Sequence, residues 1–85
     1  MARFSYKIQD ELGIHARPAG QLIKLTSGFA SDILIKSEKG EADAKRLIAV
    51  MKLGVTKGQT VEFIIHGSDE ADAEKALREF VTTNL

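Results

Sequence analysis

The sequence predicts an α+β fold in which one mainly antiparallel sheet carries helices on a single face. Three observations lead to this prediction. The chain has 85 residues, enough for one compact domain over residues 1–85. Its strand-like segments alternate apolar and polar side chains, so each has one apolar face, as is typical of antiparallel strands. The segments follow the order strand, helix, strand, strand, short helix, strand, helix.

The first two elements are a strand and a helix. Residues 3–8 alternate in character and are expected to form a half-buried strand. Its apolar face would carry Phe4, Tyr6 and Ile8. Residues 16–27 are expected to form the first helix, because apolar positions recur there at helical spacing. Gly28 is expected to follow this helix as a left-handed residue.

The middle of the chain predicts a hairpin and a short helix. Residues 32–36 and 41–44 are expected to be strands joined by a turn at residues 38–40. Residues 46–51 are too short and too continuously apolar for periodicity to decide. We expect a short helix there, because Gly54 closes the segment.

The last two elements are again a strand and a helix. Residues 60–66 alternate, with Val61, Phe63 and Ile65 on the core face. Ser68 is the expected N-cap of the last helix, whose apolar stripe runs to near the C-terminus. The acidic opening of this helix is expected to be a solvated face that complements the helix dipole. Its members are Asp69, Glu70, Asp72 and Glu74.

Composition excludes several classes of function. Lys and Arg total 12, as do Asp and Glu, and the resulting net charge of zero argues against a nucleic-acid binder. There is no cysteine, so disulfides and Cys-based zinc sites are excluded. No apolar run approaches the roughly 20 residues of a membrane-spanning helix, and residues 1–13 lack the apolar core of a secretory signal. A soluble domain inside the cell is therefore expected.

The strongest candidate for chemistry is His15, at the entrance to the first predicted helix. Pro18 suits the first helical turn, which places His15 at or beside the N-cap. Free backbone N–H groups and the positive end of the dipole converge there, favouring an uncharged imidazole with one nucleophilic nitrogen. An attached anion would meet the N–H groups of Ala16 and Arg17 and the Arg17 guanidinium. Phosphoryl transfer onto histidine fits this arrangement, and the alternative is an ordinary polar cap.

Two segments resemble one known family. Residues 13–19 read GIHARPA, and residues 45–54 read KRLIAVMKLG. The first closely resembles the active-site signature of the histidine-containing phosphocarrier protein (HPr) family of the bacterial sugar phosphotransferase system. The second is similar to another block of that family, in the same register. The resemblance covers essentially the whole chain and implies an open-faced β-sandwich, with about four antiparallel strands under three helices.

The resemblance also implies a function. A carrier of this kind accepts a phosphoryl group on Nδ1 of His15 from enzyme I, which is charged by phosphoenolpyruvate. It then passes the group to the A domain of a sugar-specific enzyme II. Arg17 would hold the phosphoryl group, and Pro18 would fix the helix start. Such a protein is a covalent carrier rather than a turnover enzyme, needs no cofactor or metal, and is expected to be a cytoplasmic monomer.

A partner-docking surface is expected beside this site. Carried over position by position, it comprises Lys24, Ser27, Arg46, Leu47, Ile48 and Met51. Residues 45–57 hold four basic and no acidic side chains, and an apolar patch with a basic rim suits a partner with an acidic rim. The alternative is that the apolar members of this set belong to the core, as is expected of Val50.

Two positions depart from the family pattern. Many HPr proteins of Gram-positive bacteria carry a kinase-phosphorylated serine where this chain has Arg46, so that switch is expected to be absent. Leu12 stands where the family usually has a small polar residue. These departures support a rival hypothesis, a regulatory paralogue phosphorylated on His15 that does not serve sugar uptake.

Other candidates have plainer interpretations. His66 is interpreted as a surface residue, and no recognisable ligand spacing joins it to His15 in a metal site. A non-catalytic interaction or RNA-binding module would need aromatic or basic residues on the exposed strand face. The residues found there are Ser5, Lys7, Glu62 and Ile64, which makes this module a poor alternative.

Overall fold

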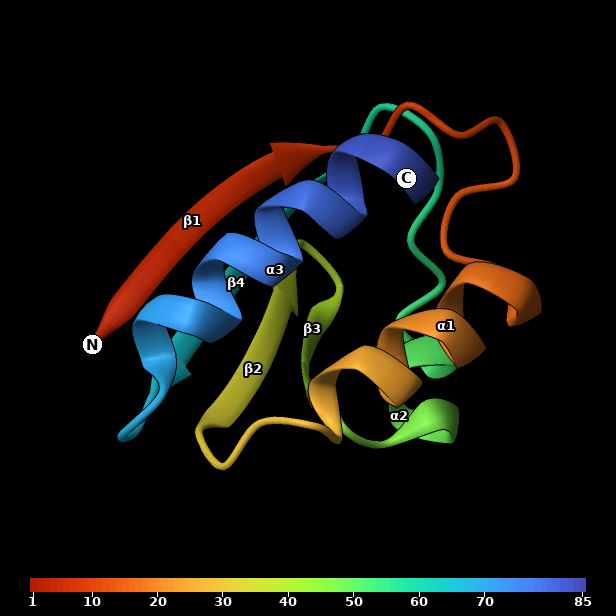
Figure 1. Ribbon diagram of the computed structural model, residues 1–85. Helices are drawn as coiled ribbons and strands as arrows, with labels where there is room; N and C mark the ends of the chain where they lie inside the picture. Colours follow the sequence, from red (N-terminus) through yellow and green to blue (C-terminus); the bar gives the residue numbers. More distant parts are fainter.

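The computed structural model describes residues 1–85 and confirms the predicted order of elements (Figure 1). The elements are β1 (Ala2–Lys7), α1 (Ala16–Thr26), β2 (Asp32–Ser37), β3 (Gly40–Asp43), α2 (Leu47–Lys52), β4 (Thr60–His66) and α3 (Glu70–Asn84). Their ends lie within one or two residues of the predicted positions, as is usual for element boundaries. No helix has both the length and the apolar character needed to cross a membrane.

The four strands form one sheet in the order β1-β4-β2-β3, and every neighbouring pair is antiparallel. The last strand in sequence, β4, therefore lies between β1 and β2. Its central residue Phe63 is paired with Phe4 on one side and with Ile35 on the other. All three helices cover one face of this sheet, so the protein has the predicted open-faced sandwich architecture (Figure 1).

The core lies between the sheet and the helices. Phe63 and Ile35 from the sheet and Leu22 and Leu77 from α1 and α3 are fully buried in it. The rings of Phe4 and Phe63 stack with centroids 5.3 Å apart. The strand aromatics thus pack inward, as their parity predicts, and the open face offers no platform for stacking bases.

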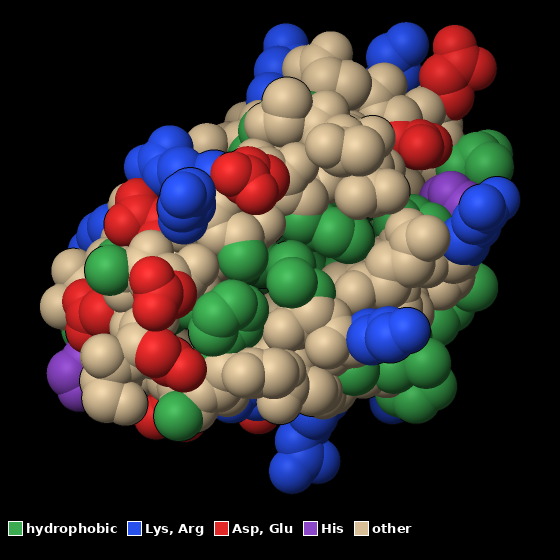
Figure 2. Space-filling model, viewed as in Figure 1, with side chains coloured by type: hydrophobic (Ala, Val, Ile, Leu, Met, Phe, Trp, Pro, Cys, Tyr) green, Lys and Arg blue, Asp and Glu red, His purple; other side chains and the backbone are tan.

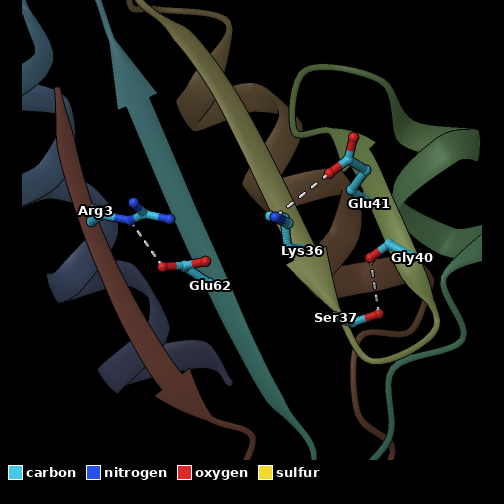
Figure 3. Close-up of polar contacts among 6 residues, drawn as sticks. All are labelled: Arg3, Lys36, Ser37, Gly40, Glu41 and Glu62. Carbon is cyan, nitrogen blue, oxygen red and sulfur yellow. Dashed lines mark hydrogen bonds and ion pairs between the residues drawn. The ribbon is translucent and has the colours of Figure 1, made fainter.

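The open face of the sheet carries charged side chains together with the partly exposed Leu34 and Ile64. Figure 3 shows this face with the helices behind it. Arg3 Nε lies 3.0 Å from Glu62 Oε2, and Lys36 Nζ lies 3.9 Å from Glu41 Oε2 (Figure 3). Exposed ion pairs of this kind each contribute up to about 1 kcal/mol. Their main consequence is that the charges of neighbouring strands are paired with one another across the face.

The end of α1 corrects one prediction. Gly28 was expected to be left-handed, but its φ is not positive. The helix instead tightens: the Gly28 N–H donates to the Leu25 carbonyl at 3.1 Å, and the Phe29 N–H donates to the Thr26 carbonyl at 3.1 Å. These bonds satisfy the last carbonyl groups without a left-handed residue. Phe29 still packs against the core as expected.

Two predictions for the start of α3, its N-cap residue and its solvated acidic face, are also corrected. The N-cap position is occupied by Asp69 rather than Ser68, and the Asp69 side chain makes no capping bond. Its carboxylate accepts hydrogen bonds from the backbone N–H groups of Ala30 (2.8 Å) and Ser31 (2.9 Å) and from the Ser31 hydroxyl. Gly67 permits this approach, since a Cβ there would lie 2.6 Å from Ser31 Cα.

The acidic opening of α3 is therefore only partly the solvated face that was predicted. Hydrogen bonds from the Ser31 hydroxyl and the Ala30 N–H hold the pKa of Asp69 below its ordinary value. Glu70 accepts the amino group of Met1 at 2.7 Å and the N–H of Gly67 at 3.2 Å, which lowers its pKa as well. These two carboxylates tie α3 to the rest of the fold.

Candidate functional site

The backbone of His15 begins α1, and its side chain takes no part in doing so. His15 is the N-cap residue, with an extended backbone (φ −95°, ψ −175°). Its carbonyl accepts the N–H of Ala19 at 3.0 Å, while its imidazole makes no capping hydrogen bond. The residue is half-buried, so the ring is attached to an ordered part of the backbone and is still accessible to solvent.

Two backbone donors beside this ring are unused. The N–H groups of Ala16 and Arg17 lie in the first turn, where a helix has no carbonyl to offer them, and no other group accepts them. Pro18 follows in the same turn and, lacking an N–H, adds no unsatisfied donor. Pro18 is buried, which fixes the path of the chain directly after the donors.

The Arg17 side chain is also free. It is exposed and takes part in none of the side-chain hydrogen bonds or ion pairs of the molecule. A guanidinium presents five N–H donors in a planar fork that suits the oxygens of a phosphoryl group. Together with the two backbone N–H groups, Arg17 makes the start of α1 suitable for an anion.

His15 and Arg17 line a polar hollow of about 280 Å³, and most of its wall was not predicted from the sequence. The other lining residues are Asp10, Pro18, Gln21, Thr83 and Asn84. Gln21 stands one turn beyond Arg17 on α1, so helical spacing is a signal that was available for it. Thr83 and Asn84 come from the last turn of α3, and no local pattern connects that turn to His15.

The loop that leads into His15 is tightly held. The N–H groups of Gln9 and Asp10 both donate to the Leu85 carbonyl oxygen, at 2.6 and 2.8 Å. Gly13 has a positive φ of 67°, and a Cβ there would overlap the carbonyl oxygen of Val55. The same carbonyl accepts the N–H of Ile14 at 3.0 Å. The candidate nucleophile, His15, therefore follows a rigid segment.

The residues predicted for docking lie at the surface of two neighbouring helices. On α2, Leu47 is 38%, Ile48 63% and Met51 37% exposed, so these side chains do not belong to the core. Val50 is fully buried, as predicted, and anchors α2. The remaining members of the predicted set are also exposed. They are Lys24, Ser27 and Arg46.

The segments that carry α1 and α2 hold no acidic side chain, although Asp10 lines the hollow beside His15. Residues 12–31 and 44–61 contain six of the twelve basic side chains and none of the acidic ones. At the right-hand edge of Figure 2, where α1 begins, a histidine and a basic side chain lie between hydrophobic side chains. The surface near the start of α1 thus combines exposed hydrophobic side chains with basic ones.

The second histidine lies elsewhere. His66 ends β4, is exposed, and pairs across the sheet with Asp32. The two histidines of the chain appear at opposite edges of Figure 2. Nowhere in residues 1–85 do three or more His, Asp or Glu side chains gather in a geometry that would hold a metal ion.

Known proteins share this sequence pattern and fold. The model of the family described as "PTS HPr component phosphorylation site" matches residues 2–83. A histidine-containing phosphocarrier protein from Mycoplasma is 33% identical, with a TM-score of 0.90 over 93% of this chain and 90% of that one. HPr from Thermoanaerobacter tengcongensis is 32% identical, with a TM-score of 0.92 over 98% and 93% of the two chains.

A third similar structure has a different character. Crh from Bacillus subtilis, described as a catabolite repression protein that forms a swapped dimer, is 27% identical. Its TM-score is 0.77, and the match covers 100% of this chain and 98% of that one. The fold and the matched sequence define a small phosphocarrier-type protein with an open-faced sheet. Within that class, the chain belongs to the HPr family of the phosphotransferase system.

Proposed function

We propose that this protein carries a phosphoryl group on Nδ1 of His15, taking it from enzyme I and passing it to the A domain of a sugar-specific enzyme II. One observation supports this proposal above the others. The imidazole of His15 has no partner in the fold, although it stands beside two unused backbone donors and an unpaired guanidinium. A fold that needed His15 for stability would occupy its ring.

The proposed step is an exchange of one phosphorus–nitrogen bond for another. The lone pair of His15 Nδ1 attacks phosphorus as the bond to the donor's histidine nitrogen breaks, and that nitrogen keeps the bonding pair. Each imidazole retains the N–H on its other nitrogen, so no proton has to leave either ring. The group would be carried and not consumed, which is why we propose a carrier rather than a turnover enzyme.

The surroundings of His15 suit the charge of the group it would carry. The phosphoryl oxygens would receive the N–H groups of Ala16 and Arg17 and the Arg17 guanidinium. Hydrogen bonds to a charged group contribute about 1.5–3 kcal/mol each. The donors are held by the helix before the group arrives, so little reorganisation is needed during transfer.

We further propose that partners dock on the surface made by Lys24, Ser27, Arg46, Leu47, Ile48 and Met51. Basic side chains surround exposed aliphatic ones on this docking surface. We therefore expect the matching surface of the partner to have an apolar centre and an acidic rim. Membership of the HPr family supports the cytoplasm as the compartment and enzymes of the phosphotransferase system as the partners. We propose that the protein works as a monomer, with the swapped dimer described for Crh as the alternative.

The second candidate is a regulatory paralogue that is phosphorylated on His15 without serving sugar uptake. Arg46, which is 78% exposed, supports a specialised paralogue because it departs from the family pattern, although arginine has no hydroxyl and so removes the serine-kinase switch. Leu12 favours it too, because a large apolar side chain stands beside the site. Transfer to a purified sugar-specific enzyme II A domain distinguishes the two functions.

The experiment is incubation with phosphoenolpyruvate and enzyme I. We expect one phosphoryl group per chain, labile in acid and stable in base, as a phosphohistidine is. His15→Ala is expected to abolish the label and to unfold at a similar temperature, because its imidazole makes no capping bond. His66→Ala is the matched control and is expected to keep the full label. A label that survives acid, or that survives His15→Ala, refutes the proposal.

A further inference from the structure

Exposed large hydrophobic side chains are unevenly distributed over the molecule. There are five: Met1, Leu12, Leu47, Ile48 and Met51. Met1 lies at the start of β1, where its amino group pairs with Glu70 at the beginning of α3. The last three belong to the docking surface on α2. Leu12 remains, 70% exposed in the loop that leads into His15, and neither the fold nor the docking surface accounts for it.

The structure fixes the position of Leu12. Its N–H donates to Asp10 Oδ1 at 2.8 Å, and the next N–H, of Gly13, donates to the Asp10 carbonyl at 2.9 Å. Beyond it, the Ile14 N–H is bonded to Val55. A backbone held at so many points keeps the Leu12 side chain projecting outward. The chain thus holds an apolar group in water on a rigid support, next to its candidate nucleophile.

Nothing in the loop requires leucine there. The turn uses only the backbone N–H of Leu12, and its side chain is absent from the hydrophobic core. A serine would satisfy the same turn and avoid the exposure of apolar area. An exposed apolar side chain on a rigid segment near a reactive group is typical of a partner-binding anchor.

We propose that Leu12 determines which proteins exchange a phosphoryl group with His15, a proposal that rests on the function proposed above. Leu12 is three residues before His15, so a partner that reaches the imidazole has to lie close to Leu12. The matching partner offers an apolar recess beside its own reacting group, rimmed by carboxylates. The carboxylates are inferred from Arg17, whose exposed guanidinium has no partner in the fold. The acidic neighbour of Leu12, Glu11, lies 3.8 Å from Lys57, which offsets its charge.

The test is substitution of Leu12 by serine. Leu12→Ser is expected to raise both the Kd for unphosphorylated enzyme I and the KM for the carrier about tenfold, by loss of buried apolar area. The value of kcat is expected to stay within about twofold, because the acceptor and its donors are untouched. Leu12→Met keeps the apolar volume, so its Kd for enzyme I and its KM are expected to equal those of the wild type.

Two controls separate binding from folding and from bulk hydrophobicity. The melting temperature of Leu12→Ser is expected to equal that of the wild type, since the side chain is exposed. Ile64→Ser removes an aliphatic side chain from the open face of the sheet and is expected to leave Kd and KM unchanged.

The outcomes are distinguishable. If the wild type is labelled on His15 and Leu12→Ser has unchanged Kd and KM, the role of Leu12 is refuted and the carrier function stands. A fall in kcat at constant KM also refutes it, since Leu12 would then act on the transfer geometry. If the wild type takes no label, the carrier function itself fails, and the role of Leu12 fails with it.

Discussion

At the N-terminus of α1, backbone and side chain have separate tasks. The His15 carbonyl closes the first helical bond with Ala19, and the Pro18 ring is buried under the turn. The imidazole and the Arg17 guanidinium have no structural partners. The proposed reactivity and the stability of the fold therefore depend on different atoms of the same few residues, and substitutions of these side chains should separate the two.

Arg17→Ala is expected to slow phosphoryl transfer to His15 by ten- to a hundredfold. The loss of hydrogen bonds to a charged group costs about 1.5–3 kcal/mol, and each 1.4 kcal/mol is a factor of ten in rate. The free energy of unfolding should change by less than about 0.5 kcal/mol, because the guanidinium contacts nothing in the fold. Single-turnover transfer and urea denaturation measure the two quantities.

Arg78→Ala is the matched control for Arg17. The Arg78 guanidinium lies 2.9 Å from Glu74 and 4.6 Å from the centre of the Phe4 ring, so it has structural partners that Arg17 lacks. Its removal should lower stability by about 0.5–1 kcal/mol and leave the transfer rate unchanged. Equal losses of stability and rate in Arg17→Ala would show that Arg17 is structural.

The position of His15 at the start of α1 was predictable because the rules for a helix N-terminus are local. Histidine followed three residues later by proline, at the start of an apolar periodicity, is enough to place His15. Thr83 and Asn84 also line the hollow, but they reach it only because α3 packs across the end of the β1–α1 loop. A sequence pattern read over a few neighbouring residues contains no information on the contact between α3 and this loop.

Among the elements, the least predictable link joins the start of α3 to the turn after α1. Asp69 and Ser31 are 38 residues apart, and their hydrogen bonds depend on the close approach of Gly67. Ser68 satisfied the local rule for an N-cap, but the tertiary contact placed Asp69 at that position. Gly28 failed as a prediction for a related reason: glycine permits a left-handed residue without requiring one.

Asp69→Asn is expected to lower the melting temperature at pH 7 and to have little effect near pH 2. Folding lowers the pKa of Asp69 from its ordinary 3.8, so the ionised carboxylate stabilises the native state above about pH 4. This contribution disappears as the pH falls through the lowered native-state pKa. Thermal unfolding of both proteins between pH 2 and pH 7 should give curves that converge in acid.

Two further variants identify the source of this pH dependence. Ser31→Ala removes the donor that lowers the pKa of Asp69 most, and should reduce the acid sensitivity in part. Asp72→Asn removes an exposed carboxylate of the same helical turn and should leave the pH profile unchanged. A difference between Asp69→Asn and the wild type that is as large at pH 2 as at pH 7 would contradict the assignment.

On the scale of the whole molecule, a net charge of zero conceals a strong asymmetry. The segments around α1 and α2, residues 12–31 and 44–61, contain basic side chains only, and every acidic side chain lies outside them. The strand charges on the open face are largely paired with each other, as in Arg3 with Glu62. On α1 the basic side chains of Arg17 and Lys24 form no ion pair, which suits fast encounter with an acidic partner.

This asymmetry predicts that the KM of the carrier for enzyme I depends more on where a charge lies than on the net charge of the protein. Lys24→Glu on α1 and Lys75→Glu on α3 make the same change in net charge, and both side chains are exposed. Lys24→Glu should raise the KM of the carrier for enzyme I several-fold at 50 mM salt, and 500 mM salt should largely remove the difference, because the Debye length shrinks to a few ångströms. Lys75→Glu should resemble the wild type at both salt concentrations. Equal effects of the two variants would mean that enzyme I responds to net charge alone, and that the basic surface around His15 does not orient the encounter.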